Sequence, residues 1–165
     1  MIKRLVPLAA LVALLAGCGG NSLTSPPPAT AAPVGGDLGS IDACSLLEAA
    51  DLPDEKLVEP GKPLSEPRSC EWKLETATVR VVVLQSAFDD VERYERRTEE
   101  LTLEGRRAWR GVETRGNTST AIYVTELSPD YTLDVRAERT PAGYSIDKVA
   151  RPAVTAVLKR LDRRS

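Results

Sequence analysis

Hydrophobic and polar residues alternate most regularly in the second half of the chain. Over residues 131–138, Tyr131, Leu133, Val135 and Ala137 alternate with polar residues, as in a half-buried antiparallel strand. Three further strands are predicted at 70–74, 79–84 and 120–126, from alternation or from runs of β-branched residues. Short joins at 75–77 and 128–130 predict hairpins. A strand over 106–112 and a short edge strand around 57–58 complete an antiparallel sheet of about five to six strands.

Helical periodicity marks three other segments. The first begins at Asp42, a good N-cap residue, and ends before Pro53. The second begins at Asp89 and places Val91, Tyr94, Thr98 and Leu101 on one face. The third is capped by Ser145 or Asp147 and runs to about Arg163, although Pro152 removes one backbone hydrogen bond within it. The predicted fold class is α+β, with two to three helices packed on the antiparallel sheet.

The N-terminus has the pattern of an export signal. Lys3 and Arg4 precede an apolar run of about a dozen residues, which is too short to cross a bilayer and typical of a signal peptide. The run ends in Leu15-Ala16-Gly17-Cys18, which looks like a bacterial lipobox. We therefore predict a lipoprotein signal peptide at 1–17, a diacylglycerol-modified Cys18 and a lipid anchor on the outer face of the cell membrane. The alternative is an ordinary secretory signal with an accidental cysteine.

Proline, serine and glycine dominate the stretch that follows. Pro26-Pro27-Pro28, Pro33 and Gly35-Gly36 leave little that could form a core, so residues 18–39 are interpreted as the lipidated cysteine and a flexible tether. Residues 40–165 are then predicted to form a single globular extracytoplasmic domain.

Composition excludes several kinds of chemistry. The chain has no histidine, which rules out Ser-His-Asp and Cys-His catalysis and histidine metal ligands. Asp89, Asp90 and Glu92 lack the glycine turn and regular spacing of a calcium loop, and are better explained as helix-capping residues. The net charge of −2 argues against nucleic-acid binding. We predict no catalytic residues, no metal and no cofactor.

Three cysteines are present, an odd number for an exported protein. Lipidation of Cys18 would leave Cys44 and Cys70. In an oxidising compartment these two would most simply form a disulfide, and free buried thiols are the alternative.

An arginine-rich region in the middle of the chain surrounds Trp109. Tryptophan beside arginine is typical of interface hot spots, so Trp109, Arg110 and Arg115 form a candidate partner contact. The alternative for Trp109 is packing in the core.

Two short motifs carry a family resemblance. Asp42-Ala43-Cys44-Ser45-Leu46-Leu47, followed by Cys70-Glu71-Trp72, resembles a family of lipoproteins of unknown function from high-GC Gram-positive (actinobacterial) bacteria, although Ala43 stands where that family usually has proline. The resemblance implies placement on the outer face of the membrane and a Cys44–Cys70 disulfide, but no activity. The order of elements is also similar to small α/β/α envelope domains of the PsbP kind.

Three classes of function remain. The first is a membrane-anchored, non-catalytic binding or interaction module that contacts an unknown protein or small-molecule partner. The second is a carrier of a lipid or other apolar ligand, which needs a cavity between helices and sheet well beyond ~300 Å³. An enzyme is the third and least favoured class.

Overall fold

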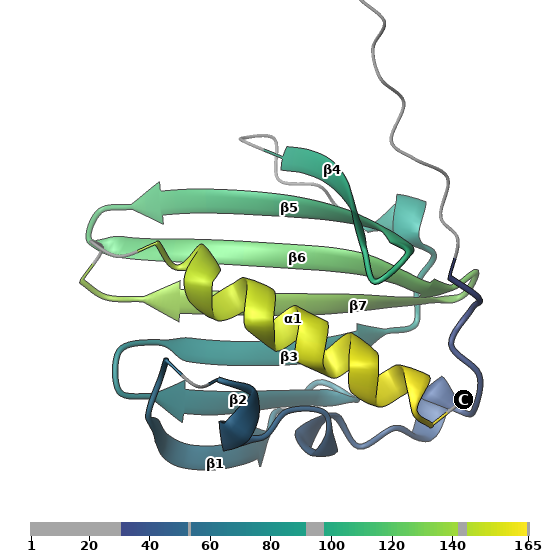
Figure 1. Cartoon of the computed structure of the whole chain (residues 1–165), viewed down its shortest axis with the longest axis horizontal. Coiled ribbons are helices and arrows are strands. Elements are labelled where there is room, and N and C mark those ends of the chain that lie inside the picture. Colours follow the sequence, from purple (N-terminus) through teal and green to yellow (C-terminus); the bar gives the residue numbers. More distant parts are fainter. Residues whose placement is uncertain (1–30, 53, 92–97, 142–144, 165) are drawn as a thin grey trace, which may run out of the picture.

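The computed structural model describes residues 31–52, 54–91, 98–141 and 145–164. These residues form a seven-stranded antiparallel sheet with one α-helix lying diagonally across one of its faces (Figure 1). The fold is mixed α+β, as predicted, but it has more strands and fewer helices than expected.

The strands form two meanders that meet in the middle of the sheet. Their spatial order is β1-β2-β3-β7-β6-β5-β4. After β3 the chain passes to the far edge of the sheet and then returns strand by strand, so β7 pairs with β3. The seven strands are β1 (Leu57–Pro63), β2 (Ser69–Leu74), β3 (Thr78–Leu84), β4 (Thr98–Leu103), β5 (Arg106–Arg115), β6 (Thr118–Ser128) and β7 (Tyr131–Arg139).

Tight turns fix the register of the second meander. Glu104 and Gly105 join β4 to β5 with φ values of 46° and 77°, the left-handed pair that a two-residue hairpin turn requires. Gly116 supplies a φ of 56° at the turn between β5 and β6. The predicted hairpins that join β2 to β3 and β6 to β7 are both confirmed.

The helix α1 (Asp147–Asp162) covers the centre of the sheet on one face. Its apolar stripe packs on the inward side chains of β3, β6 and β7, as the periodicity of both segments predicts. The predicted alternation of β7 is confirmed, because Leu133, Val135 and Ala137 lie completely buried in this core. The helix runs through Pro152 without interruption.

The start of α1 differs from the prediction. Neither Ser145 nor Asp147 caps it through a side chain; Ile146 is the N-cap residue. The Asp147 carboxylate instead accepts hydrogen bonds from Arg110 Nε at 2.9 Å and Tyr123 Oη at 2.7 Å. It therefore fastens the first turn of α1 to β5 and β6.

The predicted first helix is replaced by two 3₁₀ turns, η2 (Ala43–Ser45) and η3 (Ala49–Asp51). Asp42 is the N-cap of η2, and its carboxylate accepts the Cys44 amide at 2.9 Å. The Ser45 hydroxyl donates to the Asp42 carbonyl at 2.6 Å. Such local side-chain bonds compete with a regular helix ladder, which explains why the turn does not propagate.

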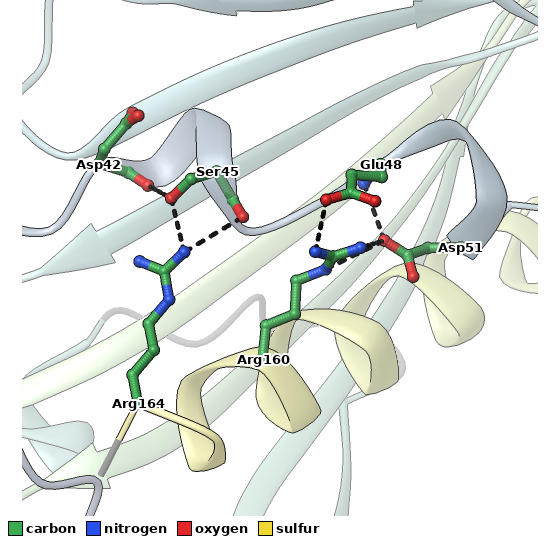
Figure 2. Close-up of polar contacts among 6 residues, drawn as sticks. All are labelled: Asp42, Ser45, Glu48, Asp51, Arg160 and Arg164. Atoms are coloured by element: carbon green, nitrogen blue, oxygen red, sulfur yellow. Dashed lines mark hydrogen bonds and ion pairs between the residues drawn. The ribbon is translucent and has the colours of Figure 1, made fainter.

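Two arginines of the helix end hold these turns in place (Figure 2). Arg160 donates to Glu48 at 2.7 Å and to Asp51 at 2.8 Å, so it bridges both ends of η3. Arg164 donates to the Ser45 hydroxyl at 2.9 Å. A disulfide between Cys44 and Cys70, with Cα atoms 5.1 Å apart, joins η2 to β2. The helix end, the turns and the sheet are therefore tied together.

The predicted second helix is also wrong where it can be compared. Phe88–Asp90 form a single 3₁₀ turn, η4, and Thr98 and Leu101 lie in strand β4. Tyr94 and the rest of 92–97 lie outside the described residues. The segment Thr98–Leu103 is short enough to fit both the helical and the strand period of apolar residues. It forms a strand because it pairs with β5.

Part of the predicted tether belongs to the domain. Residues 31–38, here called the N-terminal strap, bond to the sheet through Ala31 N to Gly105 O and Val34 N to Leu127 O, both at 2.9 Å. Val34 and Leu38 are buried in the main core. The folded part therefore extends to the N-terminal side of residue 40.

Candidate functional site

The sheet face opposite α1 is divided into two halves. Over β5 and β6 it carries a second hydrophobic cluster, in which Phe88 of η4 packs against Trp109, Ile122 and Val124. Over β3 and β7 the side chains on this face are mostly polar, because the outward positions of β7 are Thr132, Asp134, Arg136 and Glu138. The β3–β4 connection thus covers one half through Phe88, and a depression opens over the other.

This depression, here called the charged groove, has a volume of about 270 Å³. Its floor comes from neighbouring positions on β3 and β7, and one wall comes from the turn before β2. Its lining residues are Glu66, Arg80, Val82, Leu84, Asp134 and Arg136.

The two arginines of the groove face each other across the strand pair. Arg80 and Arg136 are direct register partners on β3 and β7, which places two like charges side by side. Arg80 Nη2 forms an ion pair with Glu66, whose side chain is 55% exposed. Arg80 Nε is buried and has no hydrogen-bond acceptor among the described residues. Glu66 therefore accepts from Nη2 but leaves the Nε donor of this guanidinium without an acceptor among the described residues.

Asp134 is the second incompletely satisfied group. Its carboxylate is only 20% exposed, and among the described residues the cation within ion-pair distance is Arg136, whose Nη2 is 3.9 Å away, beyond hydrogen-bond distance. Burial raises the pKa of this carboxyl above its ordinary value, Arg136 and Arg80 oppose the shift, and Glu66 adds to it. A ligand N–H could supply the hydrogen bond that Asp134 lacks in the described structure.

The charged groove combines groups that can bind a polar ligand. It brings together two guanidinium groups and two carboxylates, and its lining includes no hydroxyl, thiol or amine nucleophile. In the described part of the chain, no group of three or more His, Cys, Asp or Glu residues could hold a metal ion. The arrangement is suited to binding a small polar group.

The three residues predicted as a partner contact do not form one surface. Trp109 is completely buried and belongs to the second hydrophobic cluster. It is therefore a core residue, which was the alternative to a partner contact. Arg110, its neighbour on β5, points to the α1 side and bonds to Asp147 and Glu99. Arg115 lies near the end of β5, where it pairs with Glu113. Adjacent strand residues point to opposite faces, which separates Trp109 from Arg110.

Sequence reasoning did not single out the charged groove. The polar face of β7 is visible in the sequence, but nothing local shows that β3 is its neighbour. Because the pairing of β3 with β7 is long-range, only the tertiary structure brings Arg80 beside Arg136 and Asp134.

Cys18 lies outside the described residues. No helix in the described segments is long and apolar enough to cross a membrane.

No family model, no curated protein and no solved structure matches the chain. Its function is therefore inferred from its own residues and their geometry.

Proposed function

We propose that the protein is a lipoprotein anchored through Cys18 to the outer face of the cell membrane, and that its domain is a non-catalytic binding module whose binding surface is the charged groove. The observation that carries the proposal is the pair of incompletely satisfied groups there, Arg80 Nε and the Asp134 carboxylate. Buried polar groups are normally hydrogen-bonded, so a site that leaves two of them short of partners is suited to a polar ligand.

The contrast between the two sheet faces supports this choice of surface. Between α1 and the sheet, Val81, Val135 and Val157 are completely buried in the core. An apolar ligand entering there would have to displace these packed side chains, which makes the carrier hypothesis the weaker of the two. The charged groove needs no such rearrangement.

The distance between anchor and domain limits where the module works. A dozen residues separate Cys18 from Ala31, where the described strap begins. Fully extended, this segment spans at most roughly 45 Å. The groove is thus restricted to partners close to the membrane surface, where anchoring raises the effective concentration of the module.

The anchor is tested by substitution of the predicted lipidation site. Cells that express the wild type or Cys18→Ala are labelled with a palmitate analogue and fractionated. The wild type should carry label and sediment with membranes, while the variant should remain unprocessed or appear in the medium. Ser22→Ala is the matched control and should behave as wild type. Membrane association of a mature-sized, unlabelled Cys18→Ala variant would refute the anchor.

The binding surface is tested by site-specific crosslinking in cells. A photoreactive residue replaces Leu84 in the groove or, as a control, Val58, which is 53% exposed on β1. We expect an adduct from position 84 that is lost when Arg80→Gln is added, and none of the same mass from position 58. Identical adducts from both positions would contradict the proposal. So would substrate turnover that Asp134→Asn abolishes without unfolding the protein.

A further inference from the structure

We propose that the charged groove recognises a carboxylate together with an adjacent N–H group, the pair found at a peptide C-terminus. Arg80 binds the carboxylate and Asp134 accepts the N–H. The inference rests on the proposed function, because it names the class of ligand for the same groove.

The unfilled donor of Arg80 indicates that the ligand carries a carboxylate. Its guanidinium meets Glu66 through Nη2 alone, while Nε has no acceptor among the described residues. A carboxylate that contacts Nε and Nη2 together forms two parallel charge-assisted bonds, which is the stronger geometry. The exposed Glu66 carboxylate thus occupies Arg80 in the absence of ligand. A ligand carboxylate replaces it as the guanidinium turns to present both nitrogens.

The unfilled acceptor of Asp134 indicates that the ligand also carries an N–H donor. It lies on β7 opposite Val82, one diagonal step from Arg80, so the two side chains begin about 7–8 Å apart. Asp134 receives no hydrogen bond from the described residues, and burial raises its pKa. A donor from a ligand would satisfy the carboxylate and favour its ionised form.

The combination of groups narrows the ligand class. A simple carboxylate such as acetate has no donor for Asp134. A phosphate can offer a hydroxyl donor, but it carries more negative charge than a carboxylate and is repelled more strongly by Glu66 and Asp134. A simple cation would be repelled by the guanidinium groups of Arg80 and Arg136. A carboxylate with an amide N–H within a few ångströms complements both Arg80 and Asp134. Peptide C-termini and N-acylated amino acids share this chemistry.

The probes are acetyl-Ala-Ala, its C-terminal amide and acetate, titrated by calorimetry into purified full-length protein in detergent. We expect acetyl-Ala-Ala to bind at least about tenfold more tightly than the amide, because the amide loses the charge-assisted pair with Arg80. Acetate should also bind about tenfold more weakly, because it has no N–H for Asp134. N-acetylalanine separates the two sources: equal affinity indicates an N-acylated amino acid, and weaker affinity indicates a peptide terminus.

Variants test the proposed role of each side chain. Arg80→Gln should weaken acetyl-Ala-Ala binding by about tenfold or more, and Asp134→Asn by several-fold. Glu66→Gln should strengthen binding about two- to fivefold, because it removes the internal competitor for Arg80. Glu59→Gln is the matched control, since Glu59 is a similarly exposed partner in an ion pair with Lys73 outside the groove. It should leave the affinity unchanged, and circular dichroism should show that all variants are folded.

Equal binding of the acid and its amide, or weaker binding by Glu66→Gln, would overturn the assignment of the carboxylate to Arg80. Acetate binding as tightly as acetyl-Ala-Ala would overturn the role of Asp134. If acetyl-Ala-Ala fails to bind while the crosslink at position 84 still depends on Arg80, the ligand class is wrong and the groove remains the binding surface. If that crosslink is also absent, the proposed function fails with it.

Discussion

The Cys44–Cys70 disulfide should supply a large part of the stability of the domain. It links residues 26 positions apart and joins the η2 turn to strand β2. On the chain-entropy estimate, a cross-link that closes a loop of this length stabilises the folded state by about 3.5 kcal/mol, because it restricts the unfolded chain. We therefore expect the double variant Cys44→Ala/Cys70→Ala to lose roughly this free energy of unfolding.

The variant should still reach the native fold. Leu46 and Leu47 remain buried in the core, and Arg160 still binds Glu48 and Asp51, so the turns have other attachments (Figure 2). For a domain of this size, each kcal/mol lost from the free energy of unfolding lowers the melting temperature by about 3–4 °C. The melting temperature should therefore fall by on the order of 10–15 °C. The far-ultraviolet circular dichroism spectrum below the transition should be unchanged.

The assay is guanidinium unfolding followed by circular dichroism, with and without reductant. Reductant should destabilise the wild type to about the level of the double variant and leave the variant unaffected. Cys18→Ser is the matched control, because Cys18 is not part of the disulfide, and it should unfold like wild type. A loss below about 1 kcal/mol, or two free thiols at Cys44 and Cys70 in denatured, unreduced protein, would refute the reasoning.

Three further predictions follow from buried or closely packed positions. Trp109→Ala should lower the free energy of unfolding by about 3–5 kcal/mol, measured by urea denaturation, because Trp109 is fully buried; an unchanged stability would contradict its core role. Gly61→Ala should cost about 1–3 kcal/mol, since the new Cβ would lie 2.8 Å from Trp72 Nε1, and wild-type stability would contradict that contact. Burial raises the pKa of Asp134, so the protonated carboxyl stabilises the folded state fully below pH 3.8, and this stabilisation is lost as the pH rises through the folded pKa. Urea denaturation should therefore show Asp134→Asn to be more stable than wild type at pH 7 but not at pH 3. The opposite order would contradict the raised pKa.

Strands β5, β6 and β7 of the second meander could be predicted locally. The alternation of Tyr131, Leu133, Val135 and Ala137 identifies which face of β7 is buried, because strand side chains have a strict period of two. Turn residues such as Gly116 and Asn117 mark where the chain reverses. The apolar stripe of α1 is equally local, since it repeats with the period of a helix over sixteen residues.

Short amphipathic segments were not determined locally. Residues 98–103 fit a helix and a strand about equally, and pairing with β5 decided between them. Residues 42–51 have helical spacing, yet local bonds from Asp42 and Ser45 stop the η2 turn after three residues. The strap at 31–38 has the composition of a linker, but it runs past the ends of the sheet and of α1 (Figure 1), and Val34 and Leu38 are buried in the main core.

The sequence by itself determined the polar and apolar faces of strands such as β7, and the C-terminal helix. Only the tertiary structure decided which strands are neighbours, and therefore which polar side chains share a groove. Trp109 and Arg110 are adjacent in the sequence but lie on opposite faces of β5, whereas Arg80 and Arg136 are far apart in the sequence and lie side by side. The physical reason is that periodicity depends on contacts within a few residues, while the pairing of β3 with β7 is long-range and is fixed by burial of the whole core.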